Sequence, residues 1–227
     1  PRRNMTASSP AMKIGWQMQS EQAVIALKYF EYGQTEMTYL KGKDDQLGRV
    51  IDRVGWIRRE ITPDLFEALV FSIVGQQVSP KAAKTVCDRL TDRLKVINPE
   101  TVYNAPEEDL RACGLSGRKS GYIKGIAEKV VLGCLELDGL QNLPDDMVIQ
   151  SLTALPGIGV WTAEMLLIFS LQRPDIVSFG DFAIRRGMMT VYGIETLSKE
   201  QFAFYRSRYS PYGSVASFYL WTASKGG

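Results

Sequence analysis

Residues 152–163 read Leu-Thr-Ala-Leu-Pro-Gly-Ile-Gly-Val-Trp-Thr-Ala, and this stretch decides how the whole chain is interpreted. We expect one helix to end near Leu155 and a second helix to begin directly after the Pro-Gly-Ile-Gly turn. Two glycines around one apolar residue permit a sharp turn that exposes successive backbone N–H groups at a helix start. Such N–H groups form an anion site that suits a nucleic-acid phosphate. A tight turn between two helices, with no phosphate bound, explains the same residues equally well.

The sequence on both sides of this turn is helical in pattern. Apolar residues recur at helical spacing over 63–75, with Pro63 behind Thr62 as a start signal, and Ser79-Pro80 repeats that signal. Further helices fit the ranges 80–94, 118–135, 145–154, 160–171, 182–191, 198–207 and 213–223. Strand patterns are weak, residues 13–40 are ambiguous, and residues 1–12 are interpreted as a tail. The pattern predicts an all-α fold with many short helices.

The composition excludes several kinds of active site. The chain has 227 residues, enough for one large domain or two small lobes, and it contains no histidine. Ser-His-Asp and Cys-His nucleophile systems and HExxH zinc sites are therefore excluded. Three cysteines cannot supply a cluster held by four thiolates, and their odd number argues against a disulfide framework. We expect a reducing, cytoplasmic location.

Charge and hydropathy add little about partners. The formal net charge of +2 permits a nucleic-acid partner without requiring one. No apolar run approaches the roughly 20 residues that a membrane helix needs, so we expect no membrane partner.

The turn and a later aspartate together resemble a known family. Residues 155–159, followed by Thr162 and Ala163, are similar to the hairpin of helix-hairpin-helix (HhH-GPD) DNA glycosylases, and Asp181 stands where that family has its aspartate. The branch that the chain resembles most is 3-methyladenine DNA glycosylase II. Three further stretches resemble that branch: 73–79, 114–122 and 210–221.

The resemblance implies a fold and a domain division. It covers roughly residues 60–223 and implies a two-lobed, all-α HhH-GPD fold with a cleft between the lobes. We expect residues 61–227 to form the glycosylase domain. Residues 1–60 are expected to form a tail and a segment of uncertain structure that packs on the helical body.

The implied activity is base excision repair of alkylated DNA. The resemblance implies a monofunctional DNA glycosylase that hydrolyses the N-glycosidic bond of bases such as 3-methyladenine and 7-methylguanine. The partner is then double-stranded DNA containing damaged bases, bound by a monomer that is nucleoid-associated if bacterial. No cofactor is required. Iron–sulfur members of the superfamily have four C-terminal cysteines, whereas none follows Cys134 here, so no Fe–S cluster is expected.

Asp181 is the catalytic residue that the resemblance implies. Its spacing alone favours a helix N-cap, the commonest reason for an aspartate just before a helix. The two interpretations are compatible, because cap contacts favour an ionised carboxylate that stabilises a positive sugar. Trp161 occupies the place where bifunctional relatives have a Schiff-base lysine, which predicts a product with an intact abasic site.

The other implied site residues form a base pocket and a DNA interface. Trp161, Trp221, Phe182 and Met165 are expected to surround the flipped base, where cation–π attraction of roughly 0.5–2 kcal/mol per contact favours a cationic purine. The residues expected at DNA are Gly157, Gly159, Thr162, Gln76, Gln77, Arg118 and Lys119, with Gln77 filling the gap left by the flipped nucleotide. A structural Na⁺ or K⁺ is expected on the backbone carbonyls of Thr153, Leu155 and Ile158. Solvated helix-end glutamines and a solvated basic face explain Gln76, Gln77, Arg118 and Lys119 equally well.

Two alternatives stay open. The first is an oxidised-purine or mismatch glycosylase of the same superfamily. Trp161 in place of lysine argues against a lyase, and the missing four cysteines argue against the usual mismatch type. The second is a non-catalytic helix-hairpin-helix module that only binds DNA. Such a module needs Asp181 only as a cap and has no need of two tryptophans near one cleft.

Overall fold

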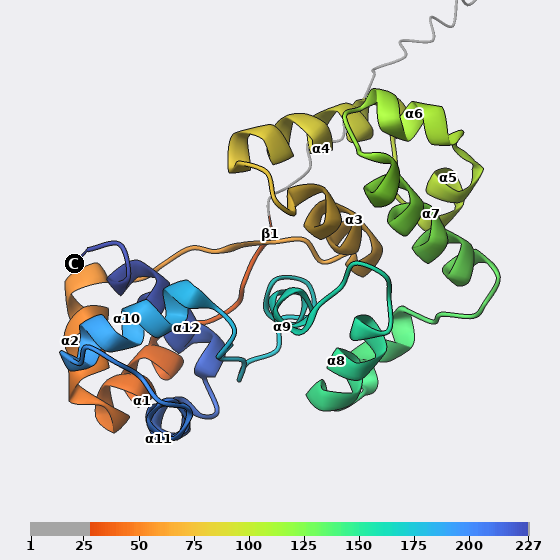
Figure 1. Ribbon diagram of the computed structural model, residues 1–227. Helices are drawn as coiled ribbons and strands as arrows, with labels where there is room; N and C mark the ends of the chain where they lie inside the picture. The colour runs from red at the N-terminus through yellow and green to blue at the C-terminus, as the bar shows by residue number, and fades with distance from the viewer. Residues whose placement is uncertain (1–27, 227) are drawn as a thin grey trace, which may run out of the picture.

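The computed structural model describes residues 28–226, which form two helical lobes with one helix between them (Figure 1). The predicted tail and the part of the ambiguous segment up to residue 27 lie outside the described residues. The first lobe contains α1 (Gln34–Lys43), α2 (Asp45–Val54), α10 (Phe182–Tyr192), α11 (Lys199–Tyr209) and α12 (Gly213–Ala223). The second lobe contains α3 (Leu65–Gly75), α4 (Pro80–Leu94), α5 (Pro99–Asn104), α6 (Glu107–Ala112), α7 (Gly117–Val131), the 3-10 helix η1 (Asp138–Asn142) and α8 (Asp145–Thr153). Helix α9 (Val160–Phe169) lies between the lobes and contacts α3 and α8.

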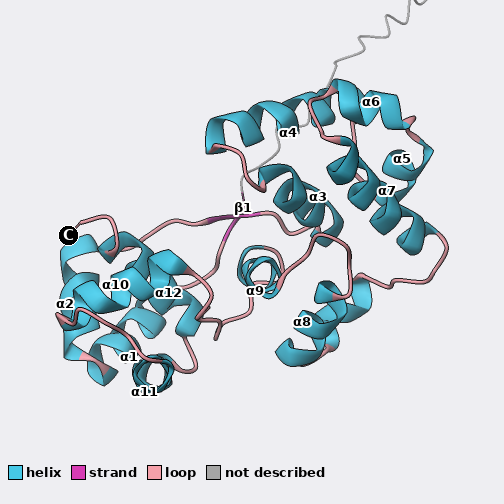
Figure 2. Ribbon diagram, in the orientation of Figure 1, coloured by secondary structure: helices cyan, strands magenta, loops and turns pink. Residues whose placement is uncertain are grey.

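A short strand pair marks the place where the chain crosses between the lobes. Strand β1 (Lys28–Tyr29) pairs antiparallel with β2 (Glu60–Ile61), and Figure 2 shows this ladder between the two groups of helices. The Thr62 N–H donates to the Phe169 carbonyl at 2.8 Å, which ties the crossing segment to the end of α9. The all-α expectation is therefore confirmed, apart from this two-residue ladder.

The helix starts follow local capping chemistry. Helix α4 begins as predicted, with the Ser79 hydroxyl accepting from the Ala82 N–H and Pro80 in the first turn. Helix α3 begins later than predicted, because the carboxylate of Asp64 caps it by accepting from the Glu67 N–H at 2.8 Å. A cap side chain with an acceptor oxygen fixed this start more strongly than the proline signal at Pro63.

Asp44 fastens the N-terminal helices to the first lobe. Its carboxylate caps α2, and it accepts from the Tyr192 hydroxyl at 2.6 Å and from Arg208 at 3.1 Å. The side chain is 3% exposed, so these donors replace the water that its charge has lost. Helices α1 and α2 are thereby packed into the same lobe as α10 and α11.

Buried apolar side chains from both lobes and from α9 form one continuous core. Helix α12 is its centre, because residues 213–220 are all buried. Helices α10 and α12 cross at Gly187, where an added Cβ would lie 2.6 Å from the Leu220 carbonyl carbon and closer still to its oxygen. No helix within residues 28–226 is long and apolar enough to cross a membrane.

The close crossing of α10 and α12 predicts a stability effect at Gly187. Gly187→Ala forces the two backbones apart and should lower the free energy of unfolding by about 3 kcal/mol or more. The matched control is Gly121→Ala on α7, where an added Cβ meets nothing within 4 Å. That change should be neutral or raise stability by about 0.5–1 kcal/mol, as alanine does in an open helix. Urea midpoints measure both, and equal midpoints for the two variants would contradict the close approach of α10 and α12 at Gly187.

Candidate active site

The Pro-Gly-Ile-Gly turn forms a hairpin between α8 and α9, as the sequence predicted. Gly157 has a positive φ of +85°, and an added Cβ would lie 2.5 Å from Cδ2 of Tyr122, so only glycine fits. Ile158 is buried and fills the turn. Gly159 is the N-cap of α9 and offers no side-chain acceptor. The first N–H groups of α9 are therefore left for an outside acceptor.

Two helix starts meet at Asp181. Its Oδ1 accepts from the Ile184 N–H at 2.9 Å, which caps α10, and its Oδ2 accepts from Trp161 Nε1–H at 2.8 Å. The residue is 7% exposed. Both carboxylate oxygens are held in place by N–H donors that complement their negative charge. The cap and the proposed catalytic position are thus compatible in one conformation.

A second carboxyl group, Glu164, lies beside this site and was not singled out from the sequence. Burial raises the pKa of Glu164, the charge of Asp181 raises it further, and a hydrogen bond from the Ser178 hydroxyl opposes both. The signal in the sequence was a lone acid inside the otherwise apolar helix α9. Glu164 does not line the cavity described next, and it supports the loop that leads to Asp181.

A cavity of about 430 Å³ opens beside the Asp181 carboxylate. This volume lies in the usual range for small-molecule sites. The residues that line it are Arg59, Trp161, Met165, Phe169, Asp181, Ala183, Trp221, Ser224 and Lys225. They come from α9, α10, the end of α12 and the crossing segment.

Phe182 departs from the expected pocket. As the first residue of α10 it is 68% exposed and does not line the cavity, where Ala183 does. Trp161, Met165 and Trp221 do line the cavity, as expected from the sequence. Phe169 and Arg59 were missed. Phe169 lies four residues after Met165 on α9, so helical spacing could have found it, whereas nothing in a single sequence shows that the crossing segment passes over the end of α12.

Stacked rings form one wall of the cavity. The ring of Trp221 stacks on Phe169 with centroids 5.7 Å apart and on Phe218 at 6.1 Å. The guanidinium carbon of Arg59 lies 5.9 Å from the Trp221 centroid and 5.7 Å from that of Phe218. The protein itself therefore places a cation on the ring that was expected to attract a cationic base.

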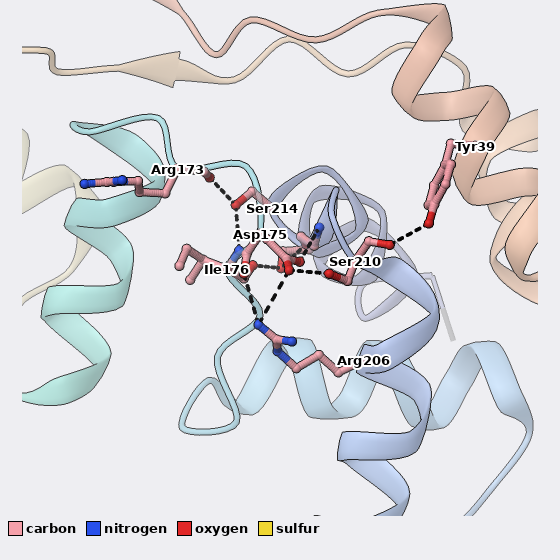
Figure 3. A network of polar contacts seen from close by, with 9 residues as sticks. Tyr39, Arg173, Asp175, Ile176, Arg206, Ser210 and Ser214 are labelled. Carbon is pink, nitrogen blue, oxygen red and sulfur yellow. Dashed lines mark hydrogen bonds and ion pairs between the residues drawn. The ribbon is translucent and has the colours of Figure 1, made fainter. Parts of the chain in front are cut away.

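A polar network joins the loop before Asp181 to the start of α12 (Figure 3). Asp175 accepts from the Gly213 N–H at 3.1 Å and from the Ser210 hydroxyl at 2.6 Å, and Ser214 Oγ accepts from the Ile176 N–H at 3.0 Å. These bonds join the loop that leads to the capping carboxylate with the start of α12, which carries the stacked wall.

The loop after α3 reaches the hairpin. Gln76 Nε2–H donates to the Gly157 carbonyl at 2.7 Å. Gln77 is exposed and has a φ of +56°, an unusual backbone conformation for a residue other than glycine. Lys95 and Gln172 also have a positive φ, so the place of Gln77 at the DNA surface stays a prediction.

The two basic residues at the start of α7, Arg118 and Lys119, have different surroundings in the structure. Lys119 Nζ–H donates to the carbonyls of Val74 at 2.8 Å and Gln76 at 2.7 Å. Burial lowers the pKa of Lys119, and the nearby charge of Arg118 lowers it further. This geometry differs from the expected phosphate contact, because the ammonium satisfies the carbonyl end of α3. Arg118 is exposed to solvent.

The remaining expected contacts involve backbone groups. Thr162 is 7% exposed, so its side chain faces the core and only its N–H, at the start of α9, suits a DNA contact.

The carbonyls expected to hold a monovalent cation lie at the hairpin. The Leu155 carbonyl, one of them, accepts from the Ile158 N–H at 3.1 Å. No group of three or more acidic or thiol side chains within residues 28–226 is placed to hold a metal ion.

Comparisons with known proteins agree with this arrangement. DNA-3-methyladenine glycosylase 1 of Schizosaccharomyces pombe is 31% identical over 195 residues, which are 82% of this chain and 86% of that protein. The crystal structure of DNA-3-methyladenine glycosidase from Bacillus halodurans matches with a TM-score of 0.77 and 36% identity, over 87% of this chain and 93% of the other. The S. pombe 3-methyladenine DNA glycosylase in complex with abasic DNA matches with a TM-score of 0.72 and 30% identity, over 84% of this chain and 97% of the other.

The match to a family model covers most of the chain. The model described as HhH-GPD superfamily base excision DNA repair protein matches residues 70–211, from the middle of α3 to just before α12. This range contains the hairpin, Trp161 and Asp181. The chain belongs to the HhH-GPD superfamily of base excision DNA repair proteins.

Proposed function

We propose that this protein is a monofunctional DNA glycosylase that excises alkylated bases of the 3-methyladenine and 7-methylguanine type. The observation that carries the proposal is a carboxylate with both oxygens held by N–H donors, on the wall of a cavity of about 430 Å³ with stacked aromatic rings. The relatives named DNA-3-methyladenine glycosylase support the substrate class.

The chemistry follows from what the cavity and the carboxylate offer. The damaged nucleotide leaves the duplex and its base enters the cavity. As the N-glycosidic bond breaks, the sugar becomes oxocarbenium-like, and the negative charge of Asp181 stabilises it. An alkylated purine already carries positive charge and leaves without protonation, so the reaction does not require a second carboxyl group as an acid.

Trp161 has two functions in this proposal. Its ring lines the cavity, and its indole N–H holds the carboxylate of Asp181 at 2.8 Å. Tryptophan forms no Schiff base, so the product is an abasic site in an uncut strand. Lys225 also lines the cavity, and a borohydride-trapped enzyme–DNA adduct would contradict the monofunctional assignment.

The hairpin and the loop after α3 form the proposed DNA interface. The N–H groups that follow Gly159 bind one backbone phosphate, and Gln77 fills the gap in the duplex. The carbonyls of Thr153, Leu155 and Ile158 hold a structural monovalent cation that orients these N–H groups. We place the glycosylase domain at residues 61–227, with residues 28–60 completing the first lobe.

The Asp181→Asn variant tests the function directly. Asparagine is also a good N-cap, so the fold is kept while the negative charge is lost. We expect base release from methylated DNA to fall at least about 100-fold, with affinity for the duplex nearly unchanged. Single-turnover release measures the effect, and Asp146→Asn, an exposed change on α8, is the matched control. Near-normal release by Asp181→Asn would reduce the residue to a cap, and no release by the wild type would favour the DNA-binding module.

The Trp161→Phe variant tests the indole hydrogen bond. Phenylalanine keeps an aromatic ring on the cavity wall but cannot donate to the carboxylate. A hydrogen bond to a charged group is worth about 1.5–3 kcal/mol, so release should slow by about ten- to a hundredfold. Trp56→Phe changes an exposed tryptophan outside the cavity and should have no effect. A loss of affinity as large as the loss of rate would mean that Trp161 acts only as a wall.

Salt dependence separates the two basic residues of α7. Arg118→Gln should lower the slope of log affinity against log salt by about one unit if the guanidinium contacts a phosphate. Lys119→Gln should leave the slope unchanged, because its ammonium is bound to two carbonyls, and should lower thermal stability instead. A one-unit decrease of the slope in Lys119→Gln would show that Lys119 does contact a phosphate.

A further inference from the structure

Arg59 brings a positive charge to the base cavity. It lines the same cavity as Asp181, yet it comes from the crossing segment between α2 and β2. This position lies outside residues 70–211, the range that matches the family model. Neither the family match nor the sequence patterns assign it a role.

The positive charge of the Arg59 guanidinium has no ion-pair partner within residues 28–226. Its side chain takes part in none of the ion pairs or hydrogen bonds found there, and its buried Nε has no acceptor. Its contacts are the ring faces of Phe218 and Trp221. Burial lowers the pKa of Arg59, but arginine stays charged in proteins. The Nη groups have no acceptor in this part of the chain either, so they are the donors left for a ligand in the cavity.

The backbone that carries Arg59 is held firmly. The Arg59 carbonyl accepts from the Phe30 N–H at 2.9 Å, directly beside the β1–β2 ladder. Two residues earlier, the Tyr32 hydroxyl accepts from the Ile57 N–H at 2.8 Å and donates to the Ile57 carbonyl at 2.7 Å. The guanidinium therefore projects from a fixed segment onto the aromatic wall.

The reaction moves negative charge onto the base. The C1′–N bond breaks with both electrons going to the base, and water adds to C1′ and loses a proton. A cationic base leaves neutral and the proton goes to solvent, whereas a neutral base leaves as an anion that takes up the proton. In both cases the charge on the base falls by one in the bond-breaking step. A fixed cation beside the base favours this change for either kind of base.

We propose that Arg59 is a catalytic residue that stabilises the departing base, by donating hydrogen bonds to its acceptor edge and by electrostatic attraction to the arriving electron pair. The fork of an arginine matches the O6 and N7 acceptors of hypoxanthine; of this pair, 7-methylguanine keeps only O6, because its N7 is methylated, and 3-methyladenine keeps only N7. Asp181 then stabilises the sugar while Arg59 stabilises the leaving group, so the cavity carries opposite charges for the two fragments. This inference rests on the proposed function.

The mechanism predicts opposite effects on binding for two kinds of lesion. A guanidinium repels a cationic base such as 7-methylguanine in the bound ground state. It attracts the O6 and N7 acceptors of a neutral base such as hypoxanthine. Removal of the charge should therefore slow the chemical step on both lesions, while it tightens the binding of one and weakens the binding of the other.

The experiment uses single-turnover release from duplexes that carry 7-methylguanine or hypoxanthine in one sequence context. Enzyme concentration is varied to obtain the maximal rate constant and the half-saturating concentration. In Arg59→Gln the rate constant should fall about tenfold or more on both lesions. The half-saturating concentration should rise for hypoxanthine and fall for 7-methylguanine. Arg59→Lys keeps the charge and should recover part of the rate.

The matched control is Arg58→Gln. Arg58 is the neighbouring exposed arginine, lies over the ring of Tyr29 at 3.8 Å and does not line the cavity, so both constants should stay at wild-type values. An unchanged rate constant in Arg59→Gln overturns the proposal. Half-saturating concentrations that shift in the same direction for both lesions also overturn it, because they indicate a structural role. If wild type and Arg58→Gln release neither base, the proposed function fails, and the inference fails with it.

Discussion

The two hydrogen bonds to Asp181 set the geometry on which the rest of the site depends. One donor, the Ile184 N–H, belongs to the helix that the carboxylate caps, and the other, the indole of Trp161, belongs to the helix after the hairpin. The carboxylate thus fixes the starts of α9 and α10 relative to each other. The proposed phosphate-binding end of α9 and the proposed catalytic group are joined through one side chain, so DNA bound at the hairpin would lie at a defined distance from the carboxylate.

Helix α7 performs a similar function on the other side of the hairpin. The ring of Tyr122 packs on Gly157, and Lys119 holds the carbonyl end of α3. Gln76 completes this arrangement by donating to the Gly157 carbonyl. The exposed, strained Gln77 is therefore placed relative to the hairpin by neighbours that are themselves fixed. Lys119, which was expected from the sequence to contact a phosphate, instead positions the end of α3.

Local patterns in the sequence predicted an all-α fold and the bounds of several helices, whereas the two-lobed architecture and the expected role of Asp181 came from the resemblance to a family. Helices α4 and α12 have the predicted bounds, because capping residues and apolar spacing are local signals. The pairing of Trp161 with Asp181 was not predicted, since it depends on how two helix starts meet. The same reason explains why Phe182 was placed in the pocket, although the first residue of α10 faces solvent. Arg59 was missed because its contact with α12 joins residues far apart in the chain.

The position of Arg59 changes the physical account of how charged bases are recognised. Cation–π attraction to Trp221 was the expected source of preference for cationic purines, yet that ring already lies beside a guanidinium. A second cation in the same cavity meets repulsion in the bound state, and the repulsion is relieved when the bond electrons reach the base. Preference for cationic bases then arises from their own lability rather than from tight binding, because the guanidinium favours the departure of either kind of base. A neutral purine with acceptor atoms enters the same cavity without that penalty. The charge pattern therefore favours selection at the chemical step over selection at the binding step.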